Sequence, residues 1–158
     1  MAGSMFQRIF NKKKPTDAHG QGRRKQRRVI PRHGTRILIV DDSTTVRFVM
    51  ARMLRESGYQ VLQADNGTAG LEMASRHQPD LIFMDVIMPG LNGFQVTRKL
   101  RQSRETKDLP IIIISGNKQV VEEFWATRIG ANDYMEKPFD RRELFYRLEK
   151  VLYHQKVA

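Results

Sequence analysis

Five polar residues could do chemistry together, because each follows a short apolar run. Asp41 and Asp42 follow Ile-Leu-Ile-Val, Asp85 follows Leu-Ile-Phe-Met, Ser115 follows a run of isoleucines, and Lys137 follows Tyr-Met-Glu. If these runs are parallel strands, their carboxyl ends meet at one edge of one sheet. Three carboxylates, a hydroxyl and an ammonium group would then share a pocket. Such a pocket suits a divalent cation and a phosphoryl group.

The elements that would position these residues alternate along the chain. From Arg36 onward, short apolar runs alternate with amphipathic stretches of helical period, in five units. This alternation is typical of a parallel sheet with helices on both faces, so we expect an α/β fold. The expected strands end near residues 40, 64, 85, 114 and 136, and the expected helices cover about 44–57, 67–77, 94–103, 119–129 and 141–152.

Local signals support the expected helix ends. Ser43 and Asp140 are good N-cap residues, and Gly58 and Gly130 can close the helices that precede them. The second expected strand, 59–64, mixes polar and apolar residues. That mixture is typical of a strand at the edge of a sheet.

The positive charge is concentrated at one end of the chain. The formal charge of the 158 residues is +11, and residues 1–36 hold eleven Lys or Arg against the single acid Asp17, which is +10. Only +1 remains for the other residues, so arguments from basicity concern the first 36 alone. We expect a basic, flexible extension over 1–34 and one domain over 35–155. Residues 1–4, which precede a second methionine, resemble a cloning remnant.

Several classes of protein are excluded by composition. The chain has no cysteine, which excludes disulfides and thiol catalysis. Its apolar runs are far shorter than the roughly eighteen residues of a membrane span, and residues 1–10 lack a signal-peptide core. Its four histidines have no ligand spacing, so we expect no zinc site. We expect a cytoplasmic protein that ends with this domain.

Three segments resemble the signatures of the response-regulator receiver domain, which is CheY-like. They are 37–43, 84–90 and 134–139, and the resemblance covers about residues 35–155. It implies a flavodoxin-like, doubly wound parallel sheet of (βα)5 type with strand order 2-1-3-4-5. It also implies a phosphorylated signalling protein of a two-component phosphorelay, not an enzyme, that accepts a phosphoryl group from a histidine kinase. Residues 88–95 and 125–137 look like PilH-type stand-alone regulators of twitching motility, which typically lack a basic extension.

Physical reasoning and the resemblance select the same phosphoacceptor. The Asp85 carboxylate could attack phosphorus directly, and the Met-Pro-Gly loop after it would expose it at the sheet edge. Several carboxylates in one site repel each other, and a hard cation such as Mg²⁺ resolves this conflict. The resemblance implies that Asp42 and Asp85 bind Mg²⁺ directly, that Asp41 binds through water, and that the Ile87 backbone carbonyl is a further ligand.

The remaining residues would bind the phosphate and report it. Lys137 would neutralise phosphoryl oxygens, and Ser115 would donate its hydroxyl to one of them and draw its loop inward. The resemblance places Tyr134 at the position of an aromatic switch and Pro138 at that of a cis proline. The phosphate would change protein binding at a face formed by the fourth helix, the fifth strand and the fifth helix, in chemotaxis-like signalling.

Each of these residues also has a plainer interpretation. Asp41 and Asp42 could cap a helix, Ser115 could belong to an ordinary turn, and Lys137 could be a solvated surface residue. Tyr134 could be packing alone. Phe124 and Trp125 could be core residues or extend a partner-binding face.

Three other functions remain open. A phosphate sink would compete for a shared kinase without an output, and a DNA- or nucleotide-binding regulator would act through the basic tail. A related phosphatase would need an acid where Ile87 stands. Within the tail, 5–10 could rest on an anionic membrane, and 23–28 could contact a nucleotide, an acidic protein or DNA; a solvated tail is the alternative.

Overall fold

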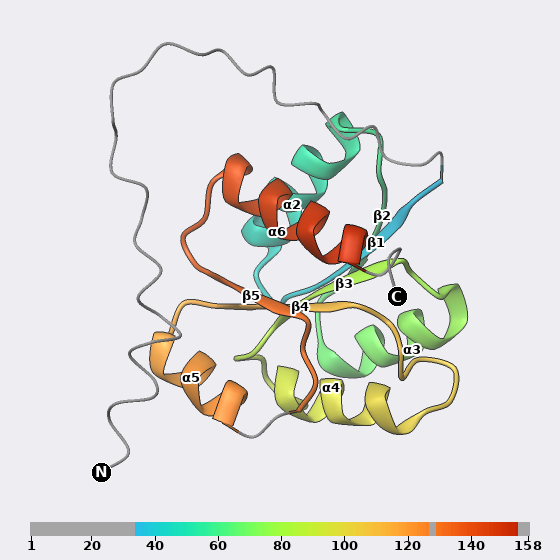
Figure 1. The fold of residues 1–158 in the computed structure, drawn as a ribbon, viewed down its shortest axis with the longest axis vertical. Helices are drawn as coiled ribbons and strands as arrows, with labels where there is room; N and C mark the ends of the chain where they lie inside the picture. The colour runs from blue at the N-terminus through green and yellow to red at the C-terminus, as the bar shows by residue number, and fades with distance from the viewer. Residues whose placement is uncertain (1–33, 127–128, 155–158) are drawn as a thin grey trace.

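The computed structural model describes residues 34–126 and 129–154 (Figure 1). In chain order the elements are β1 (Arg36–Val40), α2 (Thr44–Glu56), β2 (Gln60–Ala64), α3 (Gly67–His77), β3 (Leu81–Asp85), α4 (Gly93–Gln102), β4 (Ile111–Ser115), α5 (Lys118–Ala126), β5 (Asp133–Glu136) and α6 (Arg141–His154). Within these ranges, none of the helices has the length and apolar character needed to cross a membrane.

The strands form one parallel sheet in the order β2-β1-β3-β4-β5. Helices α2 and α6 cover one face of the sheet, and α3, α4 and α5 cover the other (Figure 1). This is the predicted α/β, flavodoxin-like architecture, with the mixed polar and apolar strand β2 at an edge as expected.

The hydrophobic core has two halves, one on each face of the sheet. Ile37 and Ile39 of β1 pack with α2 and α6, whereas Leu38 and Val40 pack with α3 and α4. All four side chains are fully buried, which explains why the strand is a continuous apolar run. The same two-sided burial holds β3 beside β1 and β4 beside β3, which positions the last residues of these strands.

The predicted helix starts are confirmed by their side-chain caps. The Ser43 hydroxyl accepts the N–H of Val46 at 3.3 Å, and the Asp140 carboxylate accepts the N–H of Glu143 at 2.8 Å. Gly130 has a φ of +93°, in the left-handed region that favours glycine. Helix α5 is described as Lys118–Ala126, and Ile129 already lies outside it, so the expected end at 129 was too late. Residues 127 and 128, and the side chains of 124 and 125 with their expected roles, lie outside the described part of the chain.

The loop after β3 depends on the absence of a side chain at Gly93. The N–H of Gly93 donates to the carbonyl of Val86 at 2.9 Å. A Cβ at this position would lie 2.3 Å from the carbonyl oxygen of Asp85 and 2.9 Å from the Cα of Val86. Both neighbours are backbone atoms, so they could move only with the strand end that carries the Asp85 carboxylate.

The Gly93→Ala variant should therefore be less stable than the wild type, by about 1 to 3 kcal/mol of unfolding free energy, because overpacking against the backbone forces a shift. Urea denaturation measures this. Gly116→Ala is the matched control, since its Cβ would meet nothing closer than the Lys137 Cβ at 3.9 Å. Equal losses in the two variants would contradict the prediction.

Candidate functional site

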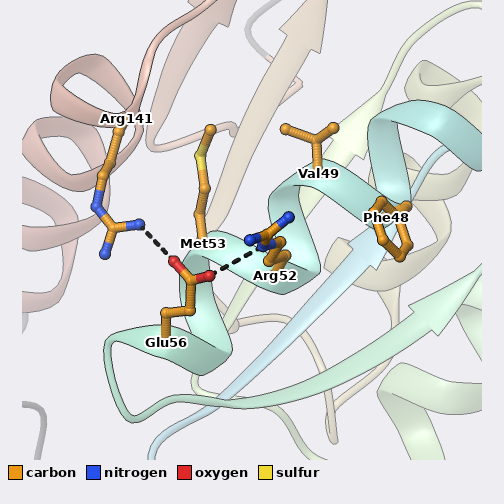
Figure 2. Close-up of a pocket in the computed structure, with 6 residues that line it drawn as sticks. All are labelled: Phe48, Val49, Arg52, Met53, Glu56 and Arg141. Atoms are coloured by element: carbon orange, nitrogen blue, oxygen red, sulfur yellow. Dashed lines mark hydrogen bonds and ion pairs between the residues drawn. The ribbon is translucent and has the colours of Figure 1, made fainter.

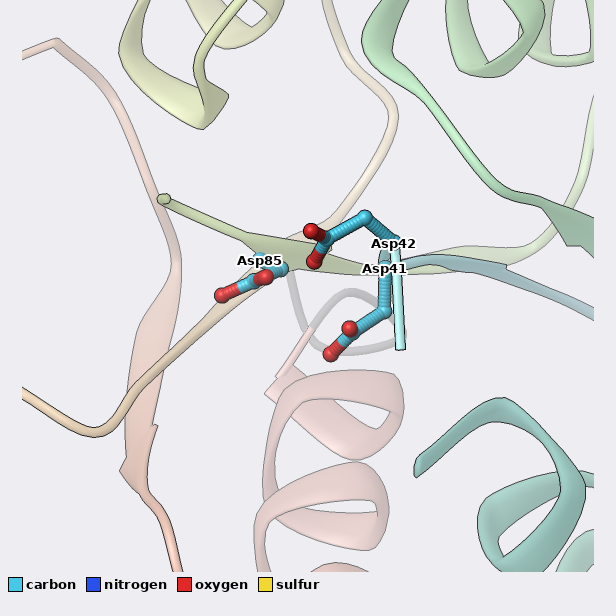
Figure 3. Close-up of side chains that lie close together, drawn as sticks. All are labelled: Asp41, Asp42 and Asp85. Carbon is cyan, nitrogen blue, oxygen red and sulfur yellow. The ribbon is translucent and has the colours of Figure 1, made fainter. Parts of the chain in front are cut away.

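Three carboxylates gather at the carboxyl edge of the central strands. Asp41 and Asp42 follow β1, and Asp85 ends the neighbouring strand β3 (Figure 3). The strands are in register, with Val40 opposite Met84, so the residues after this pair meet. One oxygen from each carboxylate lies within 4.8 Å of the others.

A single lysine joins two of these carboxylates. The Nζ of Lys137 lies 2.7 Å from an oxygen of Asp41 and 3.4 Å from an oxygen of Asp85. The Lys137 N–H donates to the carbonyl of Ser115 at 2.9 Å, so the end of β4 positions the lysine backbone. The structure thus brings together the carboxylates and the ammonium group that the sequence predicts at one edge.

The two neighbouring aspartates after β1 differ in their surroundings. Asp41 is fully buried, and its carboxylate accepts both the Lys137 ammonium and the N–H of Ser43, at 2.8 Å. Asp42 is exposed. The N-cap of α2 is Ser43, so neither aspartate has the capping role considered above. Asp41 instead holds Lys137 and the start of the helix together.

The surroundings of Asp85 raise its pKa to about 6. Burial is the main cause, and the negative charge of Asp41 adds to it, with a smaller contribution from Asp42. The positive charge of Lys137 acts in the opposite direction but does not compensate. Burial lowers the pKa of Lys137, yet its hydrogen bond to Asp41 and the nearby negative charges outweigh this and raise it. Lys137 therefore stays charged.

The donor set fits a hard divalent cation. Carboxylate oxygens are the ligands that Mg²⁺ prefers, and the exposed Asp42 leaves room for the water that Mg²⁺ retains. Three carboxylates meet the one ammonium group of Lys137, so the cluster keeps a negative charge that a cation could balance. The predicted contribution of the Ile87 carbonyl stays a prediction; the Ile87 side chain itself is 61% exposed.

Ser115 ends β4 beside Lys137, and Tyr134 lies on β5 three residues before Lys137; both side chains make contacts outside the cluster. The buried Ser115 hydroxyl accepts the N–H of Asn117 at 3.1 Å and donates to the Asn117 carbonyl at 3.4 Å. The ring of Tyr134 is half-buried, and the guanidinium carbon of Arg147 lies 5.4 Å from its centroid. The bond between Lys137 and Pro138 is cis, as the resemblance implied.

A hollow between α2 and α6 is separate from this cluster. Its volume is about 310 Å³, and its lining contains the exposed Phe48 and Val49 of α2. Glu56 pairs there with Arg52 at 2.9 Å and with Arg141 at 3.2 Å (Figure 2). Its one acid is already paired twice, so the hollow does not offer the donor set of a metal or phosphoryl site.

Sequence reasoning did not single out two groups near the predicted residues. Arg47 donates to the carbonyl of Asp41 at 2.7 Å. A sequence pattern that could have indicated it is the presence of a cation in the first turn of a helix, where cations are disfavoured. Asp133 is buried at the start of β5, where Arg147 lies at 3.0 Å and Lys150 at 3.1 Å. Asp133 lies on β5, and Arg147 and Lys150 lie on α6. No local sequence pattern indicates that these two elements would be in contact through these side chains.

A comparison of the sequence with known protein families is consistent with this geometry. A model described as the response regulator receiver domain matches residues 37–149. The chain belongs to the response regulator receiver family. It is 45% identical over 117 residues to the protein PilH of Pseudomonas aeruginosa, a match that covers 74% of this chain and 97% of PilH.

Other receiver-family relatives are longer than the matched region. The phosphate regulon regulator PhoB of Pseudomonas aeruginosa is 37% identical over 119 residues, which cover 75% of this chain but only 52% of PhoB. The response regulator MprA of Mycobacterium leprae is 41% identical, and the match covers 74% of this chain and 50% of MprA. The chain thus spans about half the length of these relatives.

Two solved structures have the same fold. The chemotaxis protein CheY4 of Vibrio cholerae has a TM-score of 0.70 at 29% identity, with 75% of this chain and 98% of CheY4 covered. The receiver domain of a sensor histidine kinase from Pseudomonas aeruginosa has a TM-score of 0.70 at 34% identity, and the match covers 75% of this chain and 98% of that receiver domain. That structure is described with a magnesium ion coordinated in its active-site cleft.

The raised pKa of Asp85 predicts a pH-dependent stability. Because the folded state binds the proton more tightly than the unfolded state, stability from this group is full below about pH 4 and is lost as pH rises through about 6. In EDTA at pH 8, Asp85→Asn should therefore raise the unfolding free energy by about 1 to 3 kcal/mol.

Chemical denaturation at pH 8 and pH 4 measures the effect, which should nearly vanish at pH 4. The exposed Asp65 supplies the control substitution Asp65→Asn, which should leave stability unchanged at both pH values. A destabilised Asp85→Asn variant at pH 8 would contradict the prediction.

Proposed function

We propose that Asp85 accepts a phosphoryl group from a histidine kinase and that this phosphorylation is the signal the protein carries. The observation that supports this most directly is the contact of Lys137 with both Asp41 and Asp85 at the edge where β1 and β3 end. A carboxylate nucleophile, an ammonium group and two further carboxylates are the parts that phosphoryl transfer to an aspartate requires.

In the proposed transfer, an oxygen of Asp85 attacks phosphorus and forms an acyl phosphate. The bond from phosphorus to the histidine nitrogen of the kinase breaks. That nitrogen keeps the electron pair and takes up a proton. Above pH 6 the Asp85 carboxylate is mostly ionised and ready to attack. Lys137, whose raised pKa keeps it charged, then neutralises phosphoryl oxygens.

Asp42 and Asp85 are the proposed direct Mg²⁺ ligands, with Asp41 acting through water and the Ile87 carbonyl as a further ligand. When bound, the metal supplies positive charge that balances the carboxylates and the incoming phosphoryl oxygens. Asp41 is poorly placed for direct ligation, because its carboxylate already accepts from Ser43 and Lys137.

We further propose that Ser115 and Tyr134 convert the phosphate into a change of surface. Ser115 would exchange its bonds with Asn117 for a phosphoryl oxygen, and the Tyr134 ring would follow the loop inward. The readout would be a downstream protein bound at the face of α5, β5 and α6, where Tyr146 is 58% exposed. The likeness to PilH supports placing this signal in chemotaxis-like or type IV pilus motility signalling, with a phosphate sink as the alternative.

The Asp85→Asn variant should lose covalent labelling by acetyl phosphate in Mg²⁺, because the amide cannot form the acyl phosphate. Intact mass spectrometry measures the gain of one phosphoryl group. The Asp65→Asn control should be labelled like the wild type. Stoichiometric labelling of the Asp85→Asn variant would show that another residue is the acceptor.

A second role is favoured by the distribution of charge. Residues 1–36 carry +10 of the net +11, and the family match begins after them, at residue 37. We propose that this extension binds an anionic partner, with a nucleotide or an acidic protein slightly ahead of DNA and with a membrane surface as a further candidate.

Replacing Arg23, Arg24, Lys25, Arg27 and Arg28 by Gln in the full chain should weaken that binding by about tenfold or more at low salt, because each lost cation removes a salt-dependent contact. Binding to an immobilised nucleotide, an acidic peptide, duplex DNA and anionic vesicles measures it, and labelling of Asp85 is the internal control. Unchanged binding to all four probes would remove the proposal.

A further inference from the structure

Arg47 occupies a position that its helix does not explain. It lies in the first turn of α2, which contains no acidic residue. The amino end of a helix carries a partial positive charge, so a cation is disfavoured there. The helix itself therefore does not favour an arginine here, whereas a contact beyond the helix does.

That contact is with the loop that carries two of the carboxylates. The Nη1 of Arg47 donates to the backbone carbonyl of Asp41 at 2.7 Å, and its Nη2 lies 3.4 Å from the Thr44 hydroxyl. The backbone N–H of Arg47 also donates to the carbonyl of Ser43 at 3.0 Å. The backbone bond is the first regular bond of the helix, so the restraint that is specific to this half-buried arginine comes from its side chain.

The carbonyl that Arg47 holds belongs to the peptide unit leading into Asp42. Carbonyl oxygen, carbon and the following nitrogen lie in one plane, so fixing the oxygen of Asp41 fixes the direction from which the Asp42 backbone starts. The Asp41 N–H is held by the Ala64 carbonyl at 3.1 Å, and the Asp41 carboxylate by Ser43 and Lys137. The exposed Asp42 depends on this frame for its direction.

We propose that Arg47 is a positioning residue for the phosphoryl-transfer site. It holds the peptide between Asp41 and Asp42 so that the Asp42 carboxylate stays within reach of Asp85, and it thereby strengthens Mg²⁺ binding. The proposal rests on the Mg²⁺ site proposed above. A hydrogen bond from a charged donor is among the stronger ones in proteins, which suits it to this role.

The sign of the effect separates positioning from simple charge. If Arg47 acted only as a nearby positive charge, its removal would tighten the binding of a divalent cation. If Arg47 positions Asp42, its removal weakens Mg²⁺ binding even though a repulsive charge is lost. The reason is that a carboxylate already held in its binding position loses less conformational entropy when the metal binds.

Isothermal titration with Mg²⁺ alone tests this on the full chain. Arg47→Met keeps the apolar stem and removes charge and donors, and we expect its Kd to rise about five- to tenfold. Arg47→Lys keeps a charged donor, so its increase in log Kd should be at most half of the increase that Arg47→Met causes. The same substitution at the exposed Arg55 of α2, Arg55→Met, is the control and should stay within twofold of the wild type.

Labelling by acetyl phosphate at varied Mg²⁺ gives the second readout. The Mg²⁺ concentration for half-maximal rate should rise by the same factor in Arg47→Met, with most of the lost rate regained at saturating Mg²⁺. If Arg47→Met does not fold, as judged by its thermal melt, Arg47→Gln carries the same expectation.

An unchanged or lower Kd in the folded Met or Gln variant would overturn the role of Arg47 alone. A wild type that does not bind Mg²⁺ at all would overturn the metal site as well. A loss of maximal rate with no change in the half-saturating Mg²⁺ concentration would also contradict the proposal.

Discussion

The structure depends on a balance of charge at one point, where buried carboxylates meet a single ammonium group. Asp41 is fully buried and Asp85 nearly so, and such groups are tolerated only when they are paired. Lys137 contacts both, but more closely Asp41, and the pKa of Asp85 rises to about 6 as a result of burial and of the Asp41 charge. The folded domain thus keeps the Asp85 carboxylate under-compensated, and Asp85 is the residue that we propose as the phosphoacceptor.

The rest of the fold can be understood as the support for that arrangement. The central strands are buried on both faces, so their ends cannot move apart to relieve the repulsion. The Gly93 N–H approaches the backbone after β3 closely, and the Ser43 cap and Arg47 restrain the loop after β1. The repulsion within the cluster destabilises the folded state, and the burial of the apolar layers on each face of the sheet offsets it. Destabilising arrangements of this kind are common at functional sites.

Much of this was predictable, because local patterns act on local geometry. Apolar runs predicted the strands, Ser43 and Asp140 predicted helix starts, and a mixed pattern placed 59–64 at the sheet edge. The convergence of the carboxylates and Lys137 followed from the rule that parallel strands end at one edge.

What was not predictable depends on tertiary contacts. That Lys137 lies nearer Asp41 than Asp85, and that Arg47 reaches the Asp41 carbonyl, depends on side-chain directions that no spacing specifies. The Asp133 cluster with Arg147 and Lys150 likewise joins residues 14 and 17 positions apart, beyond the reach of a helical repeat.

Strand β1 also gives the domain a polarity. It begins at Arg36 and runs directly to the buried Asp41, so the chain enters at the opposite edge of the sheet from the acidic cluster. Five residues of strand separate the two ends by about 17 Å, at roughly 3.3 Å per residue. A tag, a surface or a second protein attached ahead of Gly34 is therefore joined to the pole away from Asp85.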